Sequence, residues 1–352
     1  MRLETIHPKD LGATERHLWR THQRARPELA SPYLTPEWAL LIGEARADAR
    51  VCIMDGGKGF FGAQRLSPFA AMGLGAPIAD YQGIVSSEPL SVNAATLCRA
   101  LNVGRIDLTH VPQGAAPITV AGEEGSWIAE THGSRDLYEA ALKQRRSEFV
   151  RQTDKKTRKL ARDKAEPFFR AHTAPTPHFD TMLAWKNAQL QRTGQPQIWS
   201  ASWVRQVLER CTETQTPDFA SLTFTLEVDD KLVAAAFCLK SARVLHFWIV
   251  THDNAFDSYS PGVQLARWII GWAGDNGIAE IDFGPGDYQY KRQLSTGQRM
   301  LGYGVVAGAT ASGLLRQTTY AVRAGLERVP HPKIATLPGK AMRRLDLMRA
   351  LG

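Results

Sequence analysis

Residues 222–251 constrain the fold most strongly, because they predict three β-strands in immediate succession. The segments LTFTLEV, LVAAAFCLK and VLHFWIVT are rich in β-branched and aromatic residues. Only short polar turns, at 229–231 and 241–243, separate them. Strands joined by such short turns run antiparallel. This part of the chain is therefore predicted to form an antiparallel meander.

The residues after the meander predict a capped helix and then one more buried strand. Ser260 is a candidate N-cap, Pro261 suits the first helical turn, and Asn276 and Gly277 end the helix. The segment IAEIDFG predicts a short buried strand, followed by a glycine turn, a short helix near YQYKRQL and a last strand near GYGVVAGAT. The letters DFG are explained by the end of the strand and the start of that turn.

This order of elements is similar to the acyl-CoA N-acyltransferase fold of the GNAT superfamily. The resemblance implies that the acyl donor lies between the fourth strand and the next helix, where a helix N-terminus with unpaired N–H groups suits a pyrophosphate. The loop SYSPGV is shorter than the usual glycine-rich loop, and Pro261 has no N–H to donate. The predicted cofactor-binding residues are Ser260, Gly262, Val263 and Gln264.

The first half of the chain predicts a weaker version of the same plan. VCIMD and FFGAQRL form a hairpin, and SVNAATLCRALNVGRIDLTHV predicts a helix, a glycine and a strand. The predicted fold class is therefore α/β with a mixed sheet, in tandem GNAT-like domains. The expected parts are a degenerate GNAT-like domain at 1–140, a basic helical connector at 141–170, a GNAT-like domain at 171–315 and a basic amphipathic helical tail at 316–352.

The net charge of +8 is concentrated in two segments. Residues 143–170 hold eleven Lys or Arg against four acids, and residues 321–352 hold seven against two. Such concentration predicts an anionic partner, which is a nucleotide or sugar phosphate, an acidic lipid surface or RNA. A solvated helix face beside a domain boundary explains either segment equally well.

The sequence argues against membrane-spanning, secreted, metal-binding and dinucleotide-binding proteins. No apolar run approaches the roughly 20 residues that span a bilayer, and the N-terminus lacks an apolar signal segment, so we expect a cytoplasmic protein. The four cysteines form no Cys-x-x-Cys pair, so neither a metal site nor a disulfide framework is predicted. GKGFFG lies in a predicted hairpin with no helix after it, which excludes a dinucleotide or kinase loop.

Five motifs, taken in order, resemble the CelD/BcsL-type acetyltransferases, a GNAT-related family found with polysaccharide biosynthesis genes and related to the FemAB peptidyl transferases. They are SPYLTPEW near residue 31, Asp80–Tyr81, the basic RQTDKKTRKLARD, the SPG before the long helix, and DFGPGDYQYK. The resemblance runs from about residue 10 to residue 315. It implies a bacterial enzyme that moves an acetyl group from acetyl-CoA to an amine of a sugar or sugar-linked intermediate, without a metal.

Candidate catalytic residues cluster after the IAEIDFG strand. Lys291 matches a lysine of FemAB-type enzymes whose charge stabilises the transition state. Tyr288 and Tyr290 are candidate proton donors to the leaving thiolate, and Asp287 is a candidate proton acceptor. His246 shares a strand face with Trp248 and is a candidate base. The alternatives are a surface lysine, aromatic packing, a turn aspartate and a structural histidine.

Acceptor-binding residues are expected in other segments. Asp80 and Tyr81 resemble the family's Asp-Tyr pair and are candidates for binding sugar hydroxyls. Lys186, Arg158 and Arg162 are candidates for binding phosphate. Each of these residues has a surface or packing role as its alternative.

Three hypotheses for function follow. The first is N-acylation of a sugar amine in extracellular polysaccharide biosynthesis, by direct attack on acyl-CoA, with a small or lipid-linked sugar as acceptor and no nucleic acid as partner. The second is FemAB-like transfer of an aminoacyl group from charged tRNA to a cell-wall precursor. The third is a non-catalytic regulator of polysaccharide synthesis on a decayed GNAT fold that binds an anionic lipid or nucleotide. The basic tail is expected either to contact the inner face of an acidic membrane or to pack on the second domain.

Overall fold

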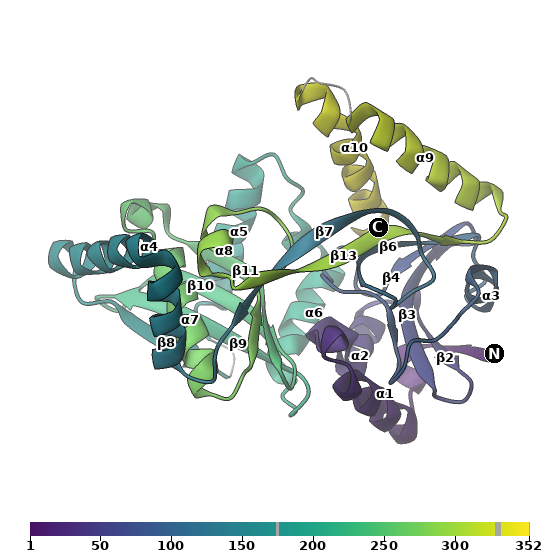
Figure 1. The fold of residues 1–352 in the computed structure, drawn as a ribbon, viewed down its shortest axis with the longest axis horizontal. Helices are drawn as coiled ribbons and strands as arrows, with labels where there is room; N and C mark the ends of the chain where they lie inside the picture. Colours follow the sequence, from purple (N-terminus) through teal and green to yellow (C-terminus); the bar gives the residue numbers. More distant parts are fainter. Residues whose placement is uncertain (174–175, 328–331, 352) are drawn as a thin grey trace. The chain divides into compact units, whose positions relative to one another are not determined.

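The computed structural model describes residues 1–173, 176–327 and 332–351, and the chain divides into two compact units (Figure 1). Unit 1 comprises residues 1–124, 201–207 and 300–352, and unit 2 comprises residues 125–200 and 208–299. Each unit combines helices with a sheet of parallel and antiparallel strands, so the predicted mixed α/β class is confirmed.

Unit 2 contains the predicted meander, whose three strands pair antiparallel in chain order. Its sheet has the order β8-β9-β10-β11-β12-β7, and only the pair β11/β12 is parallel. The strands are β8 (Phe168–His172), β9 (Ala220–Val228), β10 (Lys231–Lys240), β11 (Val244–His252) and β12 (Glu280–Asp282). The helices are α4 (Arg135–Asp163), α5 (Phe179–Arg192), α7 (Pro261–Asp275) and α8 (Gln289–Leu294).

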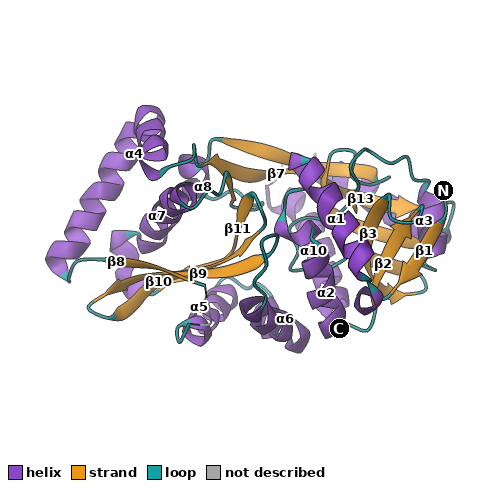
Figure 2. Cartoon of the chain, turned by 90° about the horizontal axis from the view of Figure 1, so that it is seen from below, coloured by secondary structure: helices purple, strands orange, loops and turns teal. Residues whose placement is uncertain are grey.

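Helices cover both faces of the sheet in unit 2, with α4 and α7 on one face and α5 on the other (Figure 2). The predicted helix after the meander is α7, and its buried stripe of Leu265, Ile269, Ile270 and Ala273 has the spacing of one helix face. This stripe packs with Phe224 and Leu245 of the sheet in one apolar core. The core holds α7 against β9, β10 and β11 and so fixes the position of its first turn.

Unit 1 repeats this plan. Its sheet has the order β1-β2-β3-β4-β6-β13, and only β4/β6 is parallel. The strands are β1 (Leu3–Ile6), β2 (Ala49–Met54), β3 (Gly59–Ser67), β4 (Ala70–Gly73), β5 (Ile84–Val85), which pairs with β3, and β6 (Arg105–Pro112). The helices are α1 (Ala13–Ala25), α2 (Pro36–Ala45), α3 (Ala94–Ala100), α9 (Ala311–Glu327) and α10 (Pro332–Leu351). Because α3 connects parallel strands as α7 does in unit 2, the predicted repeat is confirmed.

Each repeat takes its last strand from the other half of the chain. β7 (Thr119–Glu130) follows β6 in the chain, yet its residues 128–130 pair with β12 of unit 2. β13 (Gly297–Ala307) follows β12, yet its residues from Leu301 onward pair with β6 of unit 1. Two of the four unit boundaries therefore fall inside strands, a third falls inside α6 (Ser202–Glu213), and the fourth lies between residues 200 and 201.

This exchange makes the units differ from the expected contiguous domains. Residues 141–170, expected to be a connector, form most of α4 and β8 inside unit 2. The expected tail at 316–352 belongs to unit 1, where it forms most of α9 and α10, while its residues 328–331 and 352 lie outside the described part. None of the helices in the described ranges combines the length and apolarity that crossing a membrane requires.

Candidate active site

Strands β11 and β12 separate inside unit 2 and leave an open strand edge. Their parallel pairing covers only three positions, from Val244 and Glu280 to His246 and Asp282. There β12 ends, whereas β11 continues through residues 247–252 and pairs with β10 along its other edge. Among the described residues, no strand pairs with this edge of β11. Consecutive backbone groups of a strand point to opposite edges, so part of the amides and carbonyls of residues 247–252 face the gap.

A β-bulge marks the point where the strands separate. Phe237 of β10 pairs with Ile249, whereas Cys238 pairs with Phe247, so Trp248 is the extra residue. Such a bulge bends a strand and increases its twist. The bulge therefore explains why β11 leaves β12 at this position.

The open edge leads directly to the first turn of α7. A 3₁₀ segment, Asn254–Tyr259, connects β11 to Ser260, which has a left-handed backbone with φ of 52°. Ser260 is the N-cap residue of α7, as predicted, but in this conformation its side chain makes no capping hydrogen bond. The carbonyl of Ser260 instead accepts hydrogen bonds from the amides of Val263 (3.1 Å) and Gln264 (3.3 Å).

Basic helix α4 contacts this turn. Lys156 Nζ donates to Ser260 Oγ at 2.6 Å, and Lys159 Nζ lies 5.3 Å from the centre of the Tyr259 ring. Arg267 of α7 holds the two helices together through Glu139 and Asp154 of α4. Positive charge is thus fixed beside the N-terminus of α7, where the helix dipole is also positive.

A buried polar cluster lies where β12 ends. Asp282 Oδ1 accepts hydrogen bonds from Ser126 Oγ (2.6 Å) and from the Gly284 amide (2.8 Å), and it lies 3.6 Å from His246 Nδ1. Arg299 lies 3.8 Å from Asp282 Oδ2 and pairs with Glu280 at 2.9 Å. Burial raises the pKa of Glu280, although Arg299 acts in the opposite direction. The cluster joins β7, β11, β12 and the following turn.

Lys291 supports that turn from α8. Its Nζ donates to the carbonyl oxygens of Pro285 (2.6 Å) and Gly284 (3.2 Å), and the side chain is buried. It also lies 5.4 Å from the centre of the Tyr288 ring. The ammonium is therefore held beside the end of β12, at the mouth of the opening between the strands.

Comparison with known families matches residues 131–292 to the acetyltransferase (GNAT) domain model. These residues, slightly less than half of the chain, are similar to a GNAT acetyltransferase domain. The match lies within unit 2 apart from residues 201–207, and it includes the opening between β11 and β12, α7 and Lys291. The prediction that the protein is an acyltransferase is confirmed at the level of this domain.

Solved structures resemble the whole chain in fold. FemX has a TM-score of 0.57 with 10% identity, covering 90% of this chain and 100% of its own. The C-terminal domain of a putative lysylphosphatidylglycerol synthetase from Agrobacterium fabrum has a TM-score of 0.54 with 12% identity, covering 87% and 96%. A tandem GNAT protein of the clavulanic acid pathway is a weaker match, with a TM-score of 0.45, 11% identity and coverage of 88% and 99%. No curated protein matches the sequence.

The GNAT domain brings several predicted residues together. Lys291, Tyr288 and Tyr290 lie on or beside α8, and His246 lies in the polar cluster below them. Tyr288 is exposed, whereas Tyr290 packs against Phe283, and burial raises its pKa, which makes its hydroxyl a weaker acid. His246 is completely buried, so it cannot meet an acceptor directly. The catalytic roles stay predictions.

Asp287 and the predicted donor residues also have defined partners. Asp287 is exposed and pairs with Arg292 at 2.6 Å. Gln264 is buried, donates to the Tyr259 carbonyl and accepts from Thr157. Because Ser260 engages the amides of Val263 and Gln264, the Gly262 amide is left as the candidate donor at this turn.

The predicted acceptor residues are dispersed. Lys186 of α5 donates to the Val250 carbonyl of β11 at 3.3 Å, and burial lowers its pKa. Arg158 and Arg162 are exposed on α4. Tyr81, in unit 1, lines a small, partly open pocket of about 20 Å³ with Tyr33, while Asp80 beside it is half-buried. That pocket has room for about one water, so a sugar-binding role for Tyr81, which stays a prediction, requires it to widen.

Four polar residues of the site were missed in the sequence. Asp282 was explained as part of a turn, although an acid inside an apolar strand is a signal of a buried network. Ser126 and Arg299 lie in strands far from Asp282 in the chain, and Lys156 is one of many cations in its helix, so no local pattern distinguishes them. They are Ser126, Lys156, Asp282 and Arg299.

Proposed function

We propose that the protein is an N-acyltransferase of the CelD/BcsL type that moves an acetyl group from acetyl-CoA to an amine of a sugar intermediate in extracellular polysaccharide biosynthesis. The observation that supports this proposal is the opening between β11 and β12, where no strand of the described ranges pairs with the edge of residues 247–252, beside the first turn of α7. An extended ligand with amide groups adds to such an edge as another strand would. The pantetheine arm of coenzyme A is a ligand of this kind.

The surroundings of the edge suit the phosphates of the donor. The Gly262 amide and the α7 dipole favour an anion, and Lys156 adds a charge at the same turn. Exposed Arg158 extends the basic surface along α4. Lys186 places a further ammonium on the β11 edge itself. The donor would therefore lie with its phosphates towards α4 and its thioester towards the mouth beside Lys291.

The site must support three parts of the reaction, which are attack by the amine, stabilisation of the oxyanion and protonation of the leaving thiolate. The neutral acceptor amine attacks the thioester carbonyl, the C–N bond forms, the C–S bond breaks, the amine loses a proton and the thiolate gains one. Amides of the β11 edge would stabilise the oxyanion, and the Lys291 ammonium would favour the negative charge that develops near it. Exposed Tyr288 is the candidate that returns a proton to the thiolate. The four cysteines are buried, in agreement with direct attack.

Calorimetry and a thiol-release assay test this function. We expect acetyl-CoA to bind and free thiol to appear with nucleotide-linked amino sugars. Lys156→Ala should weaken acetyl-CoA binding about tenfold, since a charge-assisted contact is lost. Lys155→Ala is the matched control, because its neighbouring side chain is exposed on α4, and it should have little effect. Absence of both binding and thiol release would overturn the proposal.

Aminoacyl transfer from charged tRNA to a cell-wall precursor is the second candidate. The observation that favours it is the fold likeness over the whole length of FemX and nearly the whole synthetase domain, together with the exposed cations of α4. Binding of tRNA that falls steeply with salt would support it. Acetyl-CoA binding without tRNA binding would exclude it.

A further inference from the structure

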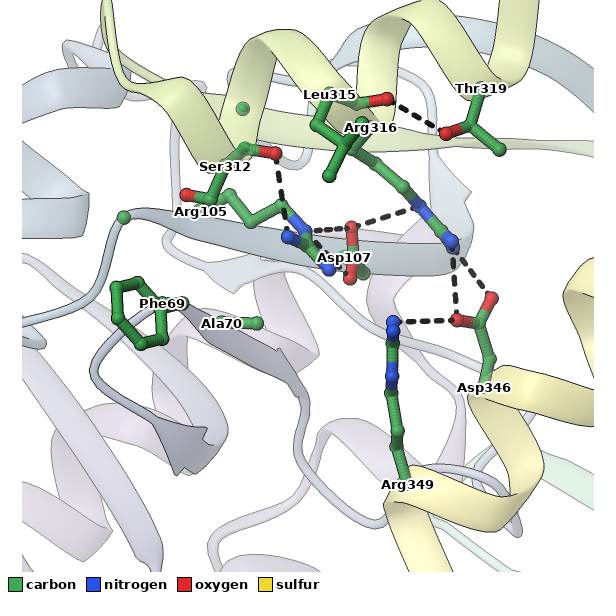
Figure 3. Close-up of polar contacts among 12 residues, drawn as sticks. Phe69, Ala70, Arg105, Asp107, Ser312, Leu315, Arg316, Thr319, Asp346 and Arg349 are labelled. Carbon is green, nitrogen blue, oxygen red and sulfur yellow. Dashed lines mark hydrogen bonds and ion pairs between the residues drawn. The ribbon is translucent and has the colours of Figure 1, made fainter.

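A buried chain of ion pairs fixes the orientation of α9 and α10 in unit 1 (Figure 3). Asp107 of β6 lies 3.1 Å from both Arg105 Nε and Arg316 Nε. Arg316 of α9 continues to Asp346 of α10 at 2.6 Å. Removing one partner would leave a buried charge uncompensated. The ion pairs therefore fix how α9 and α10 are rotated about their own axes, and so determine which face of each helix points to solvent.

Those outward faces carry aliphatic side chains. On α9, Leu315, Val322 and Leu326 follow the spacing of one helix face, and all three are exposed. On α10, Leu345 and Met348 are 50% and 56% exposed, while Met342 and Ala350 of the same helix are buried. Exposed apolar side chains that share one face of a helix indicate an interaction surface.

The same part of α10 is strongly basic. Asp346 is the only acid in this helix, and buried Arg316 neutralises it. The exposed cations of α10 are Lys340, Arg343, Arg344 and Arg349. Aliphatic side chains among cations on one helix are the composition of a helix that lies in the interface of an acidic bilayer.

We propose that α10, together with α9, docks the protein on the surface of an anionic lipid bilayer. Leu345 and Met348 enter the boundary of the acyl chains while Arg343 and Arg344 contact lipid phosphates. The occupant is a bilayer rather than RNA, because RNA-binding surfaces use aromatic stacking where this helix exposes Leu and Met. Membrane docking is a property beyond acyl transfer, and it holds whether the donor is acetyl-CoA or charged tRNA.

Vesicle sedimentation of the full chain tests the docking surface. Binding is measured with phosphatidylcholine alone and with phosphatidylcholine mixed with phosphatidylglycerol. We expect binding only to the mixed vesicles, weakened at least about fivefold by Met348→Asp and by Arg344→Glu. Leu137→Asp is the control for the first variant, because Leu137 of α4 is 59% exposed, and Lys58→Glu is the control for the second. Both controls should bind as the natural chain does.

Every other outcome overturns the proposal. If the chain does not bind the mixed vesicles, or if all variants bind them equally, α10 is not a bilayer-docking surface. A dimer that Met348→Asp dissociates identifies a second copy as the occupant instead. Binding of tRNA that Arg344→Glu weakens and Met348→Asp leaves unchanged identifies RNA. Circular dichroism and thiol release with a soluble acceptor show that each variant is folded and keeps its basal activity.

Discussion

His246 of β11 and Asp282 of β12 are both completely buried, with 3.6 Å between Nδ1 and Oδ1. They form the last paired position before the two strands separate. Since Asp282 also accepts hydrogen bonds from Ser126 and from the Gly284 amide, it joins three strands to the turn that follows β12. The opening between β11 and β12 therefore begins directly after this pair.

Removing the carboxylate of Asp282 should destabilise unit 2 strongly. Asp282→Ala leaves Ser126 and the Gly284 amide without their buried acceptor and removes one of the two carboxylates beside Arg299, so we expect a loss of about 3 kcal/mol in the free energy of unfolding. Urea denaturation measures it. Asp287→Ala is the control, since its ion pair is exposed and should contribute less than about 1 kcal/mol. Equal effects of the two changes would contradict this role for Asp282.

Lys291→Met should show how much the charge of Lys291, apart from the packing of its side chain, contributes to catalysis. The methionine keeps an apolar stem but removes the ammonium that donates to Gly284 and Pro285. We expect kcat to fall about 100-fold, a size typical of losing one electrostatic contact to the transition state, with a smaller change in KM for acetyl-CoA. Steady-state kinetics measures both constants, and Arg292→Met is the control. An unchanged kcat would show that the charge is not used in the reaction.

Two helical glycines should respond to alanine in opposite ways. A Cβ at Gly274 of α7 would lie 3.0–3.1 Å from backbone atoms of Ser134, which cannot move aside easily, so Gly274→Ala should cost about 1–3 kcal/mol. A Cβ at Gly325 of α9 meets no atom within 4 Å, so Gly325→Ala should stabilise by up to about 1 kcal/mol. Thermal unfolding compares them. A stabilising Gly274→Ala would contradict the close contact of α7 with the start of α4.

The cysteines should be inert in the folded protein. Burial raises the pKa of Cys52 to about 11, and it raises the pKa of Cys98, Cys211 and Cys238 as well. Since the thiolate is the reactive form, a chromogenic disulfide reagent should react with none of the four thiols near neutral pH until the chain unfolds. Rapid reaction of a native thiol with loss of acyl transfer would instead favour a covalent intermediate.

Local sequence patterns predicted the local elements. The meander, α7 and the hairpin of unit 1 follow from the periodicity of apolar residues and from turn residues, which are properties of neighbouring positions. The exchange of β7 and β13 was not predictable in this way, because each strand pairs with a partner far from it in the chain. The tandem repeat was recognised, but the contiguous domains inferred from it ignored this exchange.

The candidate site was predictable only in outline. The motif DFGPGDYQYK predicted the turn at Gly284 and the position of Lys291. The residues Ser260 and Pro261 predicted the N-terminus of α7. Ser260 was expected to cap α7, but its left-handed backbone turns the hydroxyl to Lys156 instead. The hydrogen bond of Asp282 with Ser126 joins residues 156 positions apart, a pairing that no spacing rule can reveal.

Hydrogen–deuterium exchange with saturating acetyl-CoA would locate the bound donor, because it reports which backbone amides the donor covers. We predict slower exchange at residues 247–252 of β11 and at Gly262 in the first turn of α7, with smaller changes elsewhere in unit 2. If acetyl-CoA binds by calorimetry yet these amides exchange at the same rate with and without it, the donor does not lie between β11 and β12.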